Sequence, residues 1–89
     1  MKWKIRFERK AERELDRLDP QIADRIIRFL KQRVASLDDP RSIGEALSGS
    51  ELGSFWKYRV GDYRIIASIE DQQVCILIVR VGNRREIYR

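Results

Sequence analysis

Cationic and aromatic side chains are concentrated in residues 55–66 of this 89-residue chain. Lys57, Arg59 and Arg64 stand there among aromatic and branched residues, and a second group follows towards the end of the chain: Arg80, Arg84, Arg85, Tyr88 and Arg89. Arginine forks match phosphate oxygens and keep their charge at any working pH. An aromatic ring can stack on a base. Because the chain contains no histidine, this set predicts chemistry on an RNA phosphodiester that depends on fixed cations instead of imidazole.

Cleavage of RNA requires a base for the 2′-hydroxyl, stabilisation of the phosphorane, and help for the leaving oxygen. Lys57 is the best candidate for the base. Its neighbour Arg59 is expected to lower the pKa of Lys57, because like charges disfavour the protonated form. Arginines carry protons poorly but stabilise negative charge well, so we expect slow catalysis unless a partner orders the substrate.

Strand alternation positions these groups. In a strand over residues 54–60, Lys57 and Arg59 share one face, and Trp56, Tyr58 and Val60 share the other. The apolar face should meet the helices, which leaves the cations on an open face as a groove bordered by aromatics. Two simpler interpretations stay open: the cations form an ordinary solvated face, and the aromatics are core or cross-strand packing.

The remaining segments predict an α+β fold. Alternation over residues 2–7 indicates a strand, and apolar residues three and four apart indicate helices over about 8–18 and from Asp19-Pro20 to about residue 36 or 37. Residues 38–53 are predicted to be a loop with a helical turn near 42–47. Strands 54–60, 63–70 and 73–81 follow, the first pair joined by Gly61-Asp62, with a short final strand over 85–89. We therefore expect one domain, residues 1–89, in which a helical hairpin covers one face of an antiparallel sheet ending in a three- to four-stranded meander.

The composition limits the classes of function that the protein can have. The formal charge is +5, which favours an anionic partner. A single cysteine, Cys75, predicts a small buried hydrophobe, and the lack of histidine argues against a structural zinc site. No apolar run is long enough to cross a bilayer, and Lys2, Lys4 and Arg6 interrupt any signal peptide. We expect a cytoplasmic protein with no metal, cofactor or membrane partner.

Three strings carry a family resemblance: LSG at 47–49, WKYRVGDYRII at 56–66 and VGNRREIY at 81–88. They resemble the RelE/ParE superfamily of toxins from toxin–antitoxin systems. The RelE branch consists of mRNA interferases that cut the codon in the ribosomal A site by 2′-hydroxyl attack without a metal. The resemblance implies a RelE-like fold, an endoribonuclease acting on ribosome-bound mRNA, and an antitoxin whose acidic segment wraps the toxin. Operator DNA would be bound only through the antitoxin complex.

The resemblance also assigns roles. Lys57 would be a base or charge stabiliser, with Arg59 as the second basic position on the sheet. Arg64 would bind the phosphate. Arg84, with Arg85 as its close alternate, would stabilise the transition state or assist the leaving group, and Tyr88 would stack on a base. Arg80, Arg85 and Arg89 would bind RNA.

Two other functions remain open. The ParE branch shares the fold but poisons DNA gyrase and lacks the full catalytic set, and a non-catalytic nucleic-acid-binding domain would also be basic. Retention of the five catalytic candidates favours the nuclease. Some branches use a histidine as acid or base, and that version is excluded here.

Overall fold

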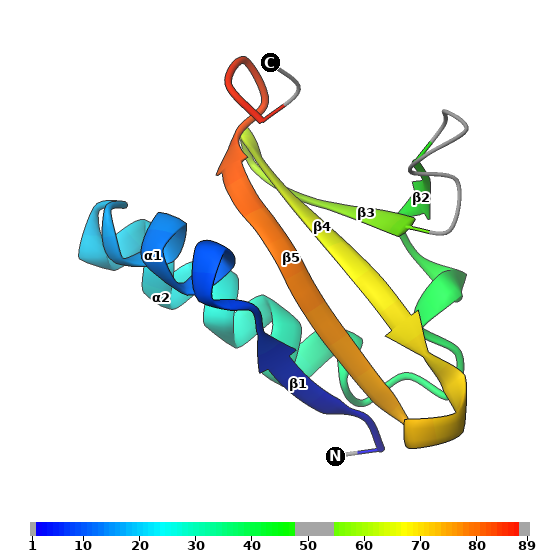
Figure 1. Ribbon diagram of the computed structural model, residues 1–89. Coiled ribbons are helices and arrows are strands. Elements are labelled where there is room, and N and C mark those ends of the chain that lie inside the picture. Colours follow the sequence, from blue (N-terminus) through cyan, green and yellow to red (C-terminus); the bar gives the residue numbers. More distant parts are fainter. Residues whose placement is uncertain (1, 48–54, 88–89) are drawn as a thin grey trace.

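The computed structural model describes residues 2–47 and 55–87. Figure 1 shows two helices beside a twisted sheet. Along the chain, the elements are β1 (Lys4–Phe7), α1 (Arg9–Asp16), α2 (Pro20–Arg28) with a π-helical continuation (Phe29–Val34), a 3-10 turn (Pro40–Ser42), β2 (Glu45–Ala46), β3 (Phe55–Val60), β4 (Tyr63–Glu70), a 3-10 turn (Asp71–Gln73) and β5 (Cys75–Asn83).

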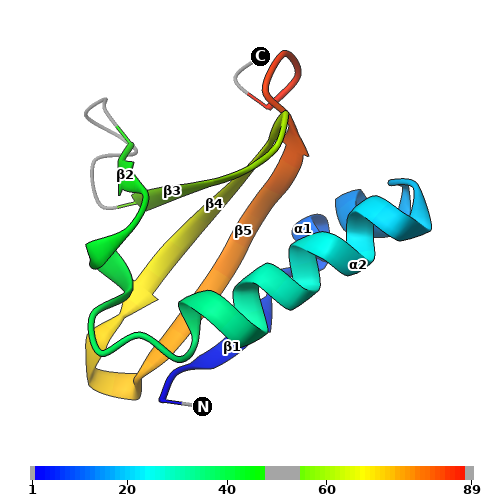
Figure 2. The ribbon, with the colours of Figure 1, turned by 180° about the vertical axis from the view of Figure 1, so that it is seen from behind.

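The five strands form one sheet in the order β1-β5-β4-β3-β2. The last three strands form the predicted antiparallel meander. The first strand pairs with β5 in parallel, so the sheet is mixed. This pairing follows from the helical hairpin, which acts as a crossover between β1 and the rest of the sheet. Both helices lie on one side of the sheet (Figures 1 and 2), and the predicted α+β class is confirmed.

Local sequence explains where the helices begin and which face they bury. The Asp19 side chain accepts a hydrogen bond from the Gln21 amide at 2.8 Å, with proline at the first position of α2. Ile26, Leu30 and Val34 recur four residues apart and are fully buried. The π-helical segment keeps the chain helical to Val34, close to the predicted end.

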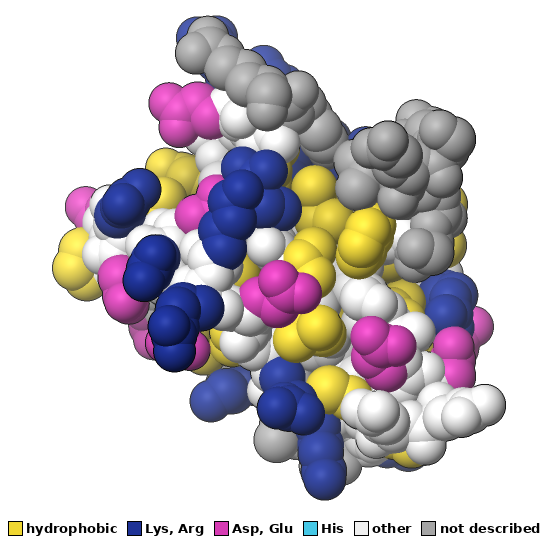
Figure 3. Space-filling view, viewed as in Figure 1, with side chains coloured by type: hydrophobic (Ala, Val, Ile, Leu, Met, Phe, Trp, Pro, Cys, Tyr) yellow, Lys and Arg dark blue, Asp and Glu magenta, His cyan; other side chains and the backbone are white. Residues whose placement is uncertain are grey.

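The sheet packs on both faces. The larger cluster lies between the sheet and the helices and includes Tyr58 and Val60 from β3. A smaller cluster of Leu47, Ile66 and Ile87 covers part of the opposite face. In Figure 3, apolar side chains are visible over β4 and β5, with lysines and arginines beside them over α1. The face away from the helices is therefore partly apolar.

Two local predictions are wrong. The predicted helical turn at 42–47 lies earlier, at Pro40–Ser42, and Glu45–Ala46 instead forms the edge strand β2. Of the predicted final strand 85–89, residues 85–87 form a turn, because the amides of Glu86 and Ile87 both bond to the Asn83 carbonyl. Residues 88 and 89 lie outside the described part of the chain. No helix in the described segments is long and apolar enough to span a membrane.

Candidate active site

Three of the predicted cations meet in one hollow. Antiparallel register places Arg59 directly opposite Arg64, and Lys57 lies two residues from Arg59 on the same face. The hollow has a volume of about 270 Å³, and the described residues that line it are Gly44, Glu45, Lys57, Arg59 and Arg64. The juxtaposition predicted from the hairpin is therefore present.

The hollow has an excess of positive charge. Arg59 and Arg64 form no ion pair within the described part of the chain. Arg64 donates only weakly to backbone carbonyls, at 3.3 Å to Gly61 and 3.2 Å to Tyr63. Like charges directly opposite on neighbouring strands are destabilising. A bound anion would remove this repulsion, so the arrangement suits a phosphate.

Glu45 is the acid among these lining residues, and sequence reasoning missed it. Its carboxylate lies 3.1 Å from Nζ of Lys57, its partner in the β2–β3 register. A carboxylate at this distance stabilises the ammonium form, which opposes the expected role of Lys57 as a base. A two-residue strand has no periodicity to detect. The sequence contained one signal for this short strand and its acid: Gly44, a glycine directly before Glu45.

Gly44 allows β2 to approach β3 closely. Its φ is +79°, and a Cβ there would lie 2.5 Å from the Lys57 carbonyl oxygen and 2.8 Å from Nε1 of Trp56. The same indole nitrogen donates to the Ile43 carbonyl at 2.7 Å. Backbone conformation and one side-chain hydrogen bond therefore fix Glu45 opposite Lys57.

The predicted aromatic border is wrong for Trp56, Tyr58 and Tyr63 of this hairpin. Tyr58 is only 1% exposed, and its hydroxyl donates to the Pro40 carbonyl at 2.6 Å. Burial raises the pKa of Tyr58 far above its ordinary value. Trp56 and Tyr63 pack against the same helix-side core. Core packing, the alternative interpretation, is confirmed for these three, while Tyr88 lies outside the described residues.

The C-terminal cations take different positions. The Arg84 amide donates to the Asp62 carbonyl at 2.9 Å, which ties the final turn to the β3–β4 turn. Arg84 and Arg85 are exposed at this end of the sheet, outside the described lining of the hollow. Their catalytic and RNA-binding roles, and those of Tyr88 and Arg89, remain predictions.

Arg80 is held by helix α1. Its Nε donates to Glu14 at 3.1 Å, and Glu14 also accepts from the Val81 amide at 3.0 Å. The carboxylate thus satisfies an amide of β5 beyond the end of its pairing with β1. Arg80 would have to leave Glu14 to bind RNA, and that role also remains a prediction.

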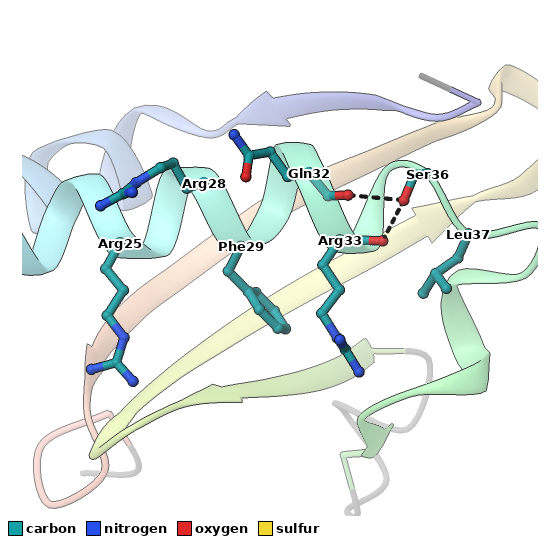
Figure 4. Close-up of a pocket in the computed structure, with 7 residues that line it drawn as sticks. All are labelled: Arg25, Arg28, Phe29, Gln32, Arg33, Ser36 and Leu37. Carbon is teal, nitrogen blue, oxygen red and sulfur yellow. Dashed lines mark hydrogen bonds between the residues drawn. The ribbon is translucent and has the colours of Figure 1, made fainter.

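A second hollow, of about 810 Å³, runs along α2 and its π-helical continuation. In Figure 4, Arg25, Phe29 and Arg33 project from the same side of the helix, towards β3. Phe29 meets Tyr58 edge to face, with ring centroids 6.2 Å apart. The four-residue spacing of these side chains was a usable signal for this groove, which the sequence analysis missed. It combines cations with an apolar floor and has the character of a surface for an acidic, partly apolar segment.

The comparisons with known proteins agree with this fold. The family model for the ParE toxin of type II toxin–antitoxin system, parDE, matches residues 5–88. Toxin RelG of Mycobacterium tuberculosis is 32% identical over 89 residues, covering 100% of this chain and 99% of RelG. The toxin–antitoxin complex RelBE2 of the same organism contains a chain with TM-score 0.78 and 28% identity, covering 94% of this chain and 100% of that one. The isolated RelE toxin of E. coli shares the fold, with TM-score 0.71 and 20% identity over 97% of this chain and 90% of that one. The chain therefore belongs to the RelE/ParE superfamily of toxins of type II toxin–antitoxin systems.

Proposed function

We propose that this toxin is a ribosome-dependent endoribonuclease that cleaves mRNA by attack of the 2′-hydroxyl without a metal. The products are a 2′,3′-cyclic phosphate or 3′-phosphate and a 5′-hydroxyl. The observation that carries the proposal is the cationic hollow on β3 and β4, where Arg59 and Arg64 face each other and neither forms an ion pair with any residue that the structure describes. A pair of like charges is costly unless an anion joins it, and the anion of this reaction is the scissile phosphate.

The role proposed for each cation follows from its position. Arg59 and Arg64 hold the non-bridging oxygens and stabilise the charge of the phosphorane. Arg84, whose backbone amide ties the final turn to the β3–β4 turn, would stabilise the transition state or assist the leaving group, and Tyr88 would support a base. Arg80, Arg85 and Arg89 add contacts to the RNA backbone.

The proposed partners are the ribosome with its mRNA and a cognate antitoxin. The relative with TM-score 0.78 is a chain of a RelBE2 toxin–antitoxin complex, which supports an antitoxin as partner here. Its acidic segment would cover cationic surface, both the hollow on β3 and β4 and the arginine-lined groove beside α2. Operator DNA would be bound only through that complex, and the site of action would be the cytoplasm.

Mapping of mRNA 5′ ends on programmed ribosomes tests the nuclease. Wild-type toxin should give discrete cuts within translated codons. Arg64→Ala and Arg84→Ala should each slow cleavage by about 10² to 10³, or roughly 2.7–4 kcal/mol of transition-state stabilisation. Lys31→Ala, a matched loss of an exposed helix cation, should leave the rate unchanged. Equal rates for all three variants would refute the assigned site.

A measurement of stability distinguishes a variant that has lost catalysis from one that has lost its fold. Arg64→Ala removes the repulsion with Arg59, so its free energy of unfolding should equal or exceed that of the wild type by about 0.2–1 kcal/mol. Urea unfolding measures this difference. A clearly less stable variant would mean that Arg64 holds the fold together, and the lost cleavage would then say nothing about catalysis.

A ParE-like poison of DNA gyrase is the second candidate, and the family whose model matches residues 5–88 favours it. DNA breaks with intact messages in cells that express the toxin would support this function over the nuclease. Unimpeded growth without an antitoxin would count against both and favour a non-catalytic nucleic-acid-binding domain.

A further inference from the structure

We propose that Glu14, on helix α1, is a positioning residue of this nuclease: it fixes the end of β5 and thereby the final turn, which carries Arg84. The proposal rests on the proposed function, in which Arg84 acts on the transition state. Glu14 lies outside the described lining of the cationic hollow. It acts on the reaction only through the backbone of β5.

Within the described part of the chain, the end of β5 has a neighbouring strand on one side only. β1 pairs with β5 from Cys75 to Ile78, whereas β5 continues to Asn83. Val81 belongs to this uncovered stretch and is only 1% exposed. A buried amide without an acceptor is costly, so the Val81 amide requires a partner from outside the sheet.

Helix α1 supplies that acceptor. Oε1 of Glu14 accepts from the Val81 amide at 3.0 Å, and Oε2 accepts from Nε of Arg80 at 3.1 Å. Ala11, three residues before Glu14 on the same face of the helix, is fully buried, so this face packs against the sheet. The Glu14 side chain is 20% exposed, so water competes little for its carboxylate. The carboxylate thus takes the place of a neighbouring strand, and its bond to the Val81 amide does not depend on the Arg80 side chain.

A β-bulge makes this second hold on β5 important. The register of β4 with β5 shifts between Ile66 and Ala67, which leaves Val79 as an extra residue in β5. A bulge disrupts the ladder locally and bends the strand that contains it. The stretch beyond Val79 is therefore held less firmly by β4, and Glu14 restrains it from the other side.

The final turn begins where β5 ends, at Asn83. The Asn83 carbonyl accepts from the Ile87 amide at 3.0 Å. The Arg84 amide donates to the Asp62 carbonyl at 2.9 Å. Both bonds depend on where Asn83 lies, and Asn83 follows Val81 by two residues. A displacement of β5 at Val81 is therefore transmitted to Arg84.

Single-turnover cleavage of mRNA on programmed ribosomes tests the proposal in Glu14→Ala and Glu14→Gln. Alanine removes the acceptor, and a resulting displacement of about 1 Å at Arg84 should slow cleavage by about 10²-fold. Glutamine keeps a carbonyl oxygen for the Val81 amide, so it should restore most of the rate. The ribosome concentration that gives half the maximal rate should not change, because Arg84 acts in the transition state.

A double-mutant cycle shows whether Glu14 acts through Arg84. In the Arg84→Ala background, Glu14→Ala should slow cleavage no further, because the group that Glu14 positions is already missing. Equal slowing in both backgrounds would overturn the proposal, and so would a Glu14→Ala variant that cleaves at the wild-type rate. Glu12→Ala is the matched control, because Glu12 is an exposed acid on the same helix, and it should cleave as the wild type does.

Amide hydrogen exchange, measured by NMR, tests the positioning independently of cleavage. Glu14→Ala should speed exchange of the Arg84 and Ile87 amides by local opening of the final turn. The Glu8 amide, which bonds to the Ile78 carbonyl at the end of β1, should exchange as in the wild type. If Glu14→Ala does not fold, Glu14→Asp, whose carboxylate is set back by one methylene, replaces it in both measurements with the same expected pattern.

The outcomes distinguish this role from the nuclease itself. Unchanged exchange of the Arg84 amide in a folded variant would overturn the role of Glu14 while leaving the nuclease in place. Absence of cleavage by the wild type would overturn the nuclease, and this assignment with it.

Discussion

Replacement of Gly44 by alanine tests whether the approach of β2 to β3 is as tight as the structure indicates. Gly44 has φ +79°, and a Cβ would lie 2.5 Å from the Lys57 carbonyl oxygen, 2.8 Å from Nε1 of Trp56 and 2.9 Å from Cδ1 of Tyr58. Two of these neighbours, a backbone oxygen and a buried ring, cannot move easily. The left-handed conformation costs an alanine about 1–2 kcal/mol, and overpacking adds about 1–3 kcal/mol.

Two other glycines separate these contributions. Gly61 also has positive φ, +60°, but its nearest neighbour for a Cβ, Nη1 of Arg25, lies 3.7 Å away. Gly61→Ala should therefore cost only the conformational part, about 1–2 kcal/mol. Gly82 lies in β5, where a Cβ would make an ordinary 3.7 Å contact with Ile87. Gly82→Ala should be neutral or stabilising by about 0.4–1 kcal/mol, because it restricts the unfolded chain.

Urea unfolding followed by tryptophan fluorescence measures all three variants. The expected order of stability is Gly82→Ala, then Gly61→Ala, then Gly44→Ala, with the last about 2–5 kcal/mol below the wild type. In thermal unfolding each kcal/mol corresponds to about 4–8 °C for a domain of this size. A Gly44→Ala variant as stable as Gly61→Ala would refute the reasoning, because it would mean that β2 does not press on β3.

Three further predictions concern stability. Tyr58→Phe removes the donor to the buried Pro40 carbonyl, so the free energy of unfolding, measured in urea, should fall by about 1–3 kcal/mol; no loss would mean that the hydrogen bond contributes nothing. Val74→Asn should raise the free energy of unfolding by about 1 kcal/mol, because Val74 has φ +49° and is 44% exposed, and asparagine tolerates this conformation better; an unchanged urea midpoint would count against strain there. The hydrogen bonds from Arg41 lower the pKa of Asp71 below its ordinary value of 3.8, so their stabilisation is present above that value and is lost as the pH falls through the lower value of the folded state. Thermal unfolding across the acid range should therefore show a shallower decline for Asp71→Asn, and parallel curves for variant and wild type would contradict this linkage.

The confirmed predictions depend on patterns between close neighbours in the sequence. Alternation in Phe55–Val60 determined which side chains face the helices. Asp19 and Pro20 set the start of α2. The Gly61-Asp62 turn fixed the register that brings Arg59 opposite Arg64. The two-residue alternation of a strand, a helix cap and a two-residue turn all depend on residues that are close together in the sequence. They can therefore be predicted from the sequence alone.

Contacts between distant segments were beyond this kind of inference. The parallel pairing of β1 with β5, the capture of Arg80 by Glu14 and the pairing of Glu45 with Lys57 all join residues that the sequence does not place together. Each depends on packing that exists only once the helices lie on the sheet and β2 lies against β3. The sequence by itself determined that fixed cations gather on one hairpin. Only the tertiary structure decided which carboxylate stands among them, because that choice is made by the close approach of two backbones.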